Sequence, residues 1–123
     1  MNNENTNYKK ATYSRTRNTS LQQSDILANQ ARIPPQAIDL EEVVLGALML
    51  EKNAVNAVID ILTPEVFYKE THQMIYSAIK ELFAKSELID ILTVTNQLKS
   101  NGNLDVVGGP YYISLLTNRV VSS

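Results

Sequence analysis

The spacing of the apolar residues constrains this chain most. From Ile38 onward they recur every three or four positions, and strict alternation is rare. This spacing gathers apolar side chains on one face of an α-helix, whereas a half-buried strand would alternate. In the first such helix, one apolar stripe consists of Leu40, Val43, Val44, Ala47 and Leu48. The opposite face is apolar too, with Leu45 and Met49. A helix that is apolar all round belongs in a core, and the pattern predicts an all-α fold with this helix at its centre.

Gly46 lies in the middle of that first helix. Glycine costs about 1 kcal/mol of helix propensity relative to alanine. We expect another helix to approach closely at this position, because only a residue without a side chain leaves room for such a contact.

Start and stop signals predict the helices that follow. They comprise a helix capped by Asn53, a short turn opened by Thr63-Pro64-Glu65, the longest helix over 71–85, a helix capped by Thr93 that ends near Asn101-Gly102, and a last helix begun by Gly108-Gly109-Pro110. The buried stripe of the longest helix is predicted to be Ile75, Tyr76, Ile79, Leu82 and Phe83. Gly102 suits the left-handed conformation that ends a helix.

The composition changes at Ile33-Pro34-Pro35. Residues 1–32 are rich in Asn, Thr, Ser, Gln and Arg and contain few apolar residues, so we predict a disordered polar, basic N-terminal tail. Residues 1–33 carry five Lys or Arg against two acidic residues, whereas residues 34–123 carry six against eleven. A basic tail therefore precedes an acidic body, and an acidic body is a poor match for a phosphate backbone.

Several classes of protein lack support in this sequence. Cysteine is absent, which excludes a disulfide scaffold and a thiolate zinc site. No apolar run reaches the roughly 18–20 residues that span a bilayer, and no secretory signal is evident, so a cytoplasmic location is the default expectation. The glycine pair Gly108-Gly109 is followed by Pro110 rather than by Lys and Ser or Thr, so it is not a phosphate-binding loop.

The titratable residues do not suggest an active site. His72 is the only histidine, and one imidazole cannot build a multi-ligand metal site. We expect it to be a helix residue partly covered by neighbours. Glu41 and Glu42 are adjacent on a helix and diverge by roughly 100°, so they are expected to be solvated and not to converge. The sequence predicts no catalytic residue, no metal ligand and no cofactor-binding residue.

The last helix offers a candidate contact strip. Tyr111 and Tyr112 are successive, so one is expected to be buried and the other exposed. Together with Leu115, the strip of Tyr111, Tyr112, Ile113 and Leu116 covers more of the circumference than one core-facing stripe uses. An exposed tyrosine is a good anchor for a protein partner, because it is large and stiff with a polar tip.

Ordered blocks over residues 33–118 resemble the N-terminal domain of DnaB-type replicative DNA helicases. The blocks are Ile33-Pro34-Pro35-Gln36-Ala37-Ile38-Asp39-Leu40-Glu41, Val44-Leu45-Gly46-Ala47-Leu48, Phe67-Tyr68, His72-Gln73 with Ile75-Tyr76, Asp90-Ile91-Leu92-Thr93-Val94, and Leu104-Asp105 with Gly108-Gly109 and Tyr112-Ile113. Val66 departs from the family, which usually has an acidic residue there.

The resemblance implies a small bundle of five to six helices over 33–118, with residues 119–123 beginning the connection to a helical hairpin. In that family the domain forms a collar on a hexameric ring, self-associates in dimer pairs, and contacts primase and the helicase loader. The family's ATP and Mg²⁺ bind a RecA-like motor domain that these 123 residues lack. The resemblance also favours Tyr112 for the side that faces the partner.

An alternative is a small helical nucleic-acid-binding regulator that uses the basic tail as an arm. Against it, no predicted helix carries the clustered Arg, Lys, Asn and Gln that read base edges. A complete small enzyme has least support, because no catalytic constellation is present.

Overall fold

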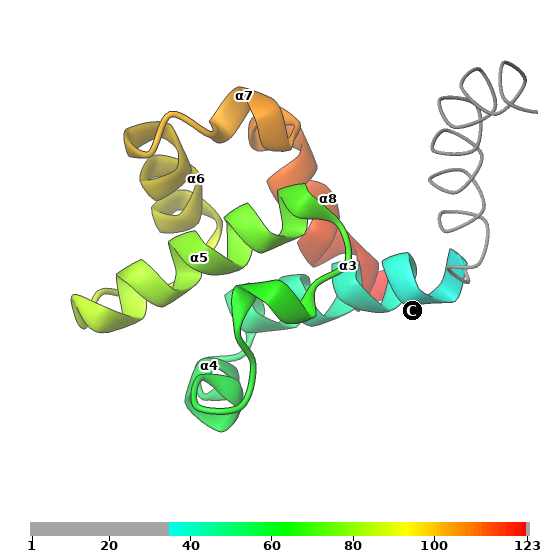
Figure 1. Ribbon diagram of the computed structural model, residues 1–123, viewed down its shortest axis with the longest axis horizontal. Coiled ribbons are helices and arrows are strands. Elements are labelled where there is room, and N and C mark those ends of the chain that lie inside the picture. Colours follow the sequence, from blue (N-terminus) through cyan, green and yellow to red (C-terminus); the bar gives the residue numbers. More distant parts are fainter. Residues whose placement is uncertain (1–34, 123) are drawn as a thin grey trace, which may run out of the picture. The chain divides into compact units, whose positions relative to one another are not determined.

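The computed structural model describes residues 35–122. In order along the chain its elements are α3 (Pro35–Leu50), α4 (Ala54–Val58), the 3-10 turn η1 (Pro64–Val66), α5 (Glu70–Ala84), α6 (Ile91–Ser100), α7 (Leu104–Val107) and α8 (Gly109–Ser122) (Figure 1). These residues form six α-helices and contain no strand, which confirms the predicted all-α bundle of five to six helices. The predicted disordered tail, residues 1–32, lies outside the described residues.

Helix α3 packs against α8 and α5, and it buries residues from both of its predicted apolar faces. Leu45, Leu48 and Met49 are buried, whereas Leu40 is 63% exposed. Both faces of this helix are apolar, so residue spacing alone could not fix its rotation. The helix also begins at Pro35, earlier than the expected Ile38, because proline is well suited to a first helical position where no N–H is needed.

Helices α3 and α8 are in close contact at Gly46. A Cβ atom at this position would touch the backbone carbonyl of Leu116, 2.7 Å from its carbon, and would lie 2.8 Å from Cγ2 of Val120. The predicted close approach of another helix is therefore confirmed.

Helix α5 crosses the centre of the domain and buries most of its predicted stripe. Ile75, Tyr76, Ile79 and Leu82 are at most 2% exposed. Phe83 is 37% exposed, so its assignment to the buried stripe was wrong: its side chain lines an open pocket near the end of α5. With 15 residues, α5 is also shorter than α3, which has 16 because of its early start at Pro35.

The segment that contains η1 is fastened to α5 by two hydrogen bonds. The hydroxyl of Tyr76 donates to the carbonyl oxygen of Leu62 at 2.9 Å, and Nε2 of Gln73 donates to that of Phe67 at 2.7 Å. The rings of Phe67 and Tyr76 pack with their centroids 5.2 Å apart. These contacts satisfy backbone groups of the irregular segment and give it a fixed place on α5.

Helix α6 is capped by Asp90, not by Thr93. The N–H of Thr93 donates to Oδ1 of Asp90, and the N–H of Asp90 donates to Oγ1 of Thr93, each at 2.9 Å. The predicted cap was wrong because Thr93 holds the third helical position of a reciprocal capping box. Gly102 adopts the expected left-handed conformation, with φ +76°.

Two boundaries near the C-terminal end differ from expectation. The four-residue helix α7 was not predicted, because so short a segment shows no periodicity. Helix α8 begins at the predicted glycine pair but continues without interruption through Arg119 to Ser122. Residues 119–122 thus belong to α8, and their connection to a hairpin stays a prediction.

Candidate functional site

A polar cluster lies where α3, α5 and α8 meet. It consists of Glu41 and Glu42 from α3, His72 from α5, and Tyr112 and Arg119 from α8. The second turn of α3 meets the first turn of α5 there, and α8 contributes two residues that are two turns apart. Partners separated by 31 to 77 positions in the sequence are thereby brought into contact.

His72 is the centre of this cluster and is completely buried. Its Nδ1 lies 2.7 Å from Oε1 of Glu41, and its Nε2 lies 2.7 Å from the hydroxyl oxygen of Tyr112. His72 was expected to be only partly covered, whereas both of its ring nitrogens are buried and hydrogen-bonded. Residues 35–122 contain no group of three His, Cys, Asp or Glu side chains arranged to hold a metal ion.

Glu41 and Glu42 correct a sequence prediction. Both were expected to be solvated, yet each side chain is only 13% exposed. Oε2 of Glu41 accepts from the N–H of Tyr68 at 2.5 Å, and Oε2 of Glu42 accepts from the hydroxyl of Tyr112 at 2.8 Å. The two carboxylates do diverge around α3, but His72 and Tyr112 together are long enough to span the gap between them.

Tyr112 owes its protonation behaviour to these surroundings. Burial raises the pKa of the Tyr112 hydroxyl well above its usual range, and the hydrogen bond to Glu42 raises it further. The ring also lies beneath Lys69, whose Nζ is 5.6 Å from the ring centroid. The phenol therefore remains a hydrogen-bond donor at any physiological pH.

Arg119 closes the cluster toward solvent. Its Nη2 lies 2.7 Å from Oδ1 of Asp39, and its Nε lies 3.2 Å from Oε1 of Glu42. The Arg119 and Asp39 side chains are 39% and 60% exposed. Such solvated ion pairs contribute little to stability, so this contact mainly orients the end of α8 on the start of α3.

The predicted contact strip on the last helix is only partly available. Tyr111 is 78% exposed, whereas Ile113 and Leu116 are completely buried and belong to the core. Tyr112 is half-buried and directs its hydroxyl into the polar cluster. Assigning Ile113 and Leu116 to a partner-facing surface was therefore wrong, and the preference for Tyr112 over Tyr111 does not fit their exposure.

The outward side of the last helix is instead formed by Tyr111, Ser114, Asn118 and Val121, which recur every three or four residues; we call it the α8 outer face. Tyr111 and Val121, at its two ends, are 78% and 77% exposed. Large apolar side chains held in solvent at both ends of a helix face are suited to contact with another protein.

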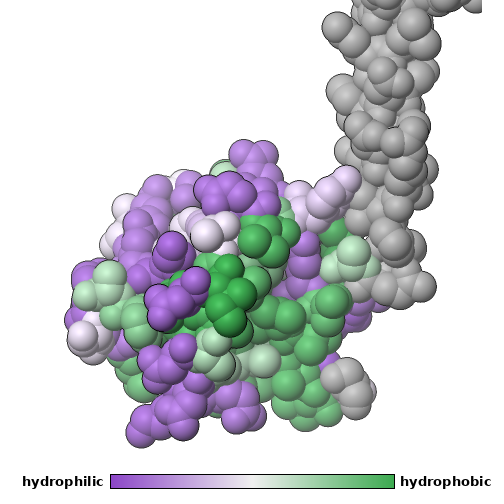
Figure 2. Space-filling model, turned by 60° about the horizontal axis from the view of Figure 1, so that its bottom comes forward, coloured by the Kyte–Doolittle hydropathy of each residue, from purple (hydrophilic) through white to green (hydrophobic). Residues whose placement is uncertain are grey.

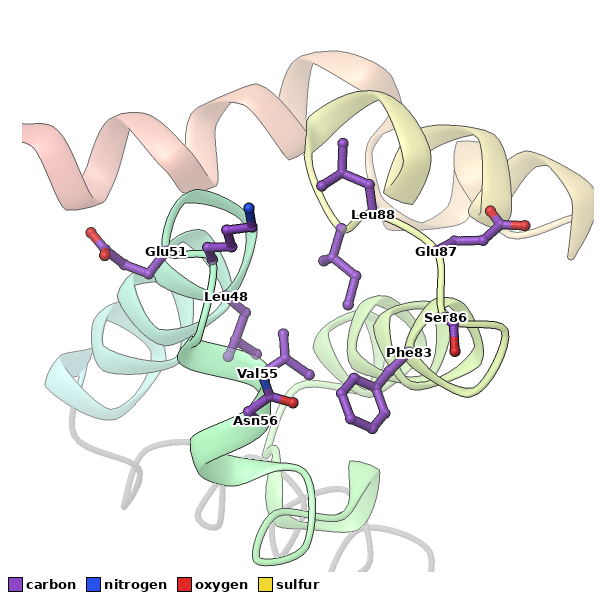
Figure 3. A pocket seen from close by; sticks show the side chains of 10 residues that line it. Leu48, Glu51, Val55, Asn56, Phe83, Ser86, Glu87 and Leu88 are labelled. Atoms are coloured by element: carbon purple, nitrogen blue, oxygen red, sulfur yellow. The ribbon is translucent and has the colours of Figure 1, made fainter.

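An open pocket of about 470 Å³ lies between the ends of α3 and α5 and the start of α4. In Figure 3, Leu48, Val55 and Phe83 reach into the space between α4 and α5. Figure 2 shows one face of the domain, on which hydrophobic residues gather at the centre and toward the lower right, with hydrophilic residues along the left and lower left. The spacing of residues in the sequence could not predict this pocket, because the pocket depends on how the ends of α3 and α5 and the start of α4 lie in space.

None of the helices within residues 35–122 combines the length and the apolar character needed to span a membrane.

Comparison with known proteins identifies the family. Residues 33–123 match the family model described as the DnaB-like helicase N terminal domain. Over 92 residues, 75% of this chain, the sequence is 47% identical to the replicative DNA helicase DnaB of Rhodothermus marinus. It is 39% identical over 89 residues, 72% of this chain, to the replicative DNA helicase DnaC of Bacillus subtilis (strain 168).

The fold agrees with that match. The crystal structure of the N-terminal domain of DnaB helicase from Mycobacterium tuberculosis superposes with a TM-score of 0.67 and 38% identity, covering 71% of this chain and 60% of that one. The aligned region spans 10% of the Rhodothermus marinus protein and 20% of the Bacillus subtilis protein, so only their N-terminal domain is matched. The chain belongs to the DnaB-like helicase N-terminal domain family.

Proposed function

We propose that this domain is the assembly and partner-docking collar of a hexameric replicative DNA helicase. It supports association of the ring and offers surfaces to primase and to the helicase loader during DNA replication. ATP hydrolysis and movement along DNA are then tasks of a separate motor domain. The observation that carries the proposal is the family match over residues 33–123, the whole described bundle.

The charge and chemistry of the described residues support a role in protein contacts. The body carries eleven acidic residues against six basic ones, which disfavours a phosphate backbone as its main partner. The polar cluster is fully engaged in holding helices together. What remains exposed and apolar includes the α8 outer face, and an exposed aromatic anchor of this kind is typical of residues that dominate an interface.

We assign the main contact with primase to the α8 outer face, with Tyr111 as its anchor. Tyr111 makes no hydrogen bond that fixes it to the described bundle and is 78% exposed, so its ring can be buried by a partner. The α8 outer face also continues to Val121, near the end of the helix, where it lies beside any segment that follows α8.

The experiment titrates the C-terminal helical domain of the cognate primase against the parent chain and two variants. Tyr111→Ala is expected to weaken binding about thirtyfold, equivalent to about 2 kcal/mol, with an unchanged melting temperature. Ile61→Ala is the matched control, because Ile61 is 74% exposed but lies between α4 and η1 rather than on α8. Equal affinity of all three proteins would remove the α8 outer face from the proposal.

If none of the three proteins, the parent included, binds primase, the docking role itself fails. Binding by the parent that only Ile61→Ala weakens would keep the docking role but move the contact to the other side of the domain.

A further inference from the structure

The polar cluster contains an unbroken hydrogen-bonded path from one carboxylate to another. It runs from Oε1 of Glu41 to Nδ1 of His72 over 2.7 Å, from Nε2 of His72 to the hydroxyl of Tyr112 over 2.7 Å, and from that hydroxyl to Oε2 of Glu42 over 2.8 Å. All three distances are those of good hydrogen bonds. Each of the three links needs one proton between its two heavy atoms.

The groups that form the path do not hold three protons in their usual neutral-pH states. A neutral imidazole carries one N–H and a phenol carries one O–H, whereas an ionised carboxylate only accepts. Two protons are then available for three links, and the third link would bring two lone pairs together across a hydrogen-bond distance. We propose that the path from Glu41 to Glu42 is a proton-binding site that takes up one additional proton when the domain folds.

The count is the same for every arrangement of donors. If both carboxylates are ionised, His72 donates from both nitrogens as an imidazolium and Tyr112 donates to Glu42. If Glu41 holds the proton, it donates to Nδ1 of a neutral His72, whose Nε2 donates to Tyr112. If Glu42 holds the proton, it donates to Tyr112, and the Tyr112 hydroxyl donates to Nε2 of a neutral His72. In each case the path carries one proton more than a neutral histidine, a phenol and two ionised carboxylates.

Charge balance supports the additional proton. With it, the two carboxylates, the histidine and the guanidinium of Arg119 sum to zero, whereas without it the cluster keeps an uncompensated negative charge. His72 is completely buried and both glutamates are 13% exposed, so water cannot readily substitute for the missing link. A buried, unbalanced carboxylate is costly, whereas a neutral hydrogen-bonded group is tolerated.

The other charged groups around the path leave this balance unchanged. Asp39 on α3 pairs with Arg119 at the solvent edge, and Lys69 lies over the outer side of the Tyr112 ring. The nearby acidic residues on η1, α5 and α7 are exposed to solvent: Glu65, Glu70 and Asp105.

The site makes the junction of α3, α5 and α8 sensitive to pH. An unfolded histidine is half protonated near pH ~6.5. Wherever the proposed site holds its additional proton and the unfolded chain does not, the stability of the domain falls as the pH rises. Without that proton one of the three links is lost, and the start of α3 is less firmly held on α5 and α8.

The test measures urea unfolding at several pH values from about 6 to 9. For the parent chain, the unfolding equilibrium constant is expected to rise up to tenfold per pH unit between about pH 7 and pH 9. Few other groups of the chain titrate in this pH range, because the chain has one histidine and no cysteine. The terminal amino group also titrates in this range, but it is common to all variants.

Tyr112→Phe is the matched variant, since it removes the hydroxyl and with it two of the three links. The remaining link between Glu41 and His72 needs a single proton, which a neutral imidazole supplies. The unfolding constant of this variant is therefore expected to rise less steeply with pH than that of the parent from about pH 7 to pH 9. A parent profile no steeper than that of Tyr112→Phe would overturn the proposal.

Nuclear magnetic resonance of the folded parent gives a second reading that does not require a variant to fold. Near pH ~7.5, above the ordinary pKa of histidine, nitrogen shifts of the His72 ring and carboxyl carbon shifts of Glu41 and Glu42 are expected to account for the extra proton. A neutral ring together with two fully ionised carboxylates would refute it.

Discussion

At the scale of single residues, Gly46 sets the distance between α3 and α8. A Cβ atom there meets the backbone of Leu116, which cannot turn aside as a flexible side chain can. We therefore predict that Gly46→Ala destabilises the domain by about 1–3 kcal/mol through overpacking, despite its gain in helix propensity of up to about 1 kcal/mol. Urea unfolding measures the difference. An alanine variant as stable as the parent would mean that α3 and α8 can separate without cost.

Ser86 is a residue in an unfavourable backbone conformation. It follows α5 with φ +57°, and the N–H of Glu87 donates to the carbonyl oxygen of Leu82, a bonding pattern in which glycine is usual at this position. Ser86→Gly is expected to stabilise the domain by about 0.5–1 kcal/mol, because relief of the strain exceeds the added freedom of the unfolded chain.

The control for this prediction is Gly102→Ala. Gly102 has φ +76°, and no atom of a neighbouring group lies within 4 Å of the place that a Cβ atom would occupy, so only backbone strain acts there. Thermal unfolding of both variants is expected to show opposite shifts of melting temperature. Shifts in the same direction would contradict the strain argument.

At the scale of elements, α6 depends on its capping box. Asp90→Ala removes the acceptor for the N–H of Thr93 and is expected to cost about 1 kcal/mol. Asn53 caps α4 without any side-chain hydrogen bond, so Asn53→Ala is the matched control and is expected to cost much less. Chemical denaturation of the two variants distinguishes them, and equal losses would mean that the box contributes nothing specific to α6.

Helix α8 is held by a phenol whose ionisation is disfavoured. Burial and the hydrogen bond to Glu42 raise the pKa of Tyr112 in the folded domain. Above pH ~10 an unfolded tyrosine loses its proton while the folded Tyr112 retains it, so stability falls as the pH rises through that range. Tyr112→Phe is expected to flatten this alkaline decline, whereas Tyr111→Phe should leave it unchanged. Unfolding midpoints measured from about pH 9 to pH 11 provide the comparison.

At the scale of the whole molecule, local signals predicted the helices better than their contacts. Apolar spacing indicated α3, α5 and α8, and the expected close approach at Gly46 is present. The rotation of α3 was not predictable, because both of its faces are apolar and its contacts with α8 and α5 select between them. Helix α7 was missed because four residues are too few to show a period.

The polar cluster was beyond sequence reasoning for a different reason. Glu41 and Glu42 were judged on the geometry of α3 alone, where adjacent residues diverge. Glu41 bonds His72 of α5, 31 positions away, and Glu42 bonds Tyr112 of α8, 70 positions away. Nothing in the local sequence indicates either partner. The one usable signal was His72, a lone polar residue on the otherwise apolar side of α5.

One calorimetric comparison distinguishes a domain that docks a protein partner from one that binds a nucleotide. The same preparation of the chain is titrated with the C-terminal helical domain of the cognate primase and, separately, with ATP and Mg²⁺. We expect saturable heat for primase and none for the nucleotide, since the sequence has no phosphate-binding loop. Saturable nucleotide binding without any primase binding would contradict this expectation.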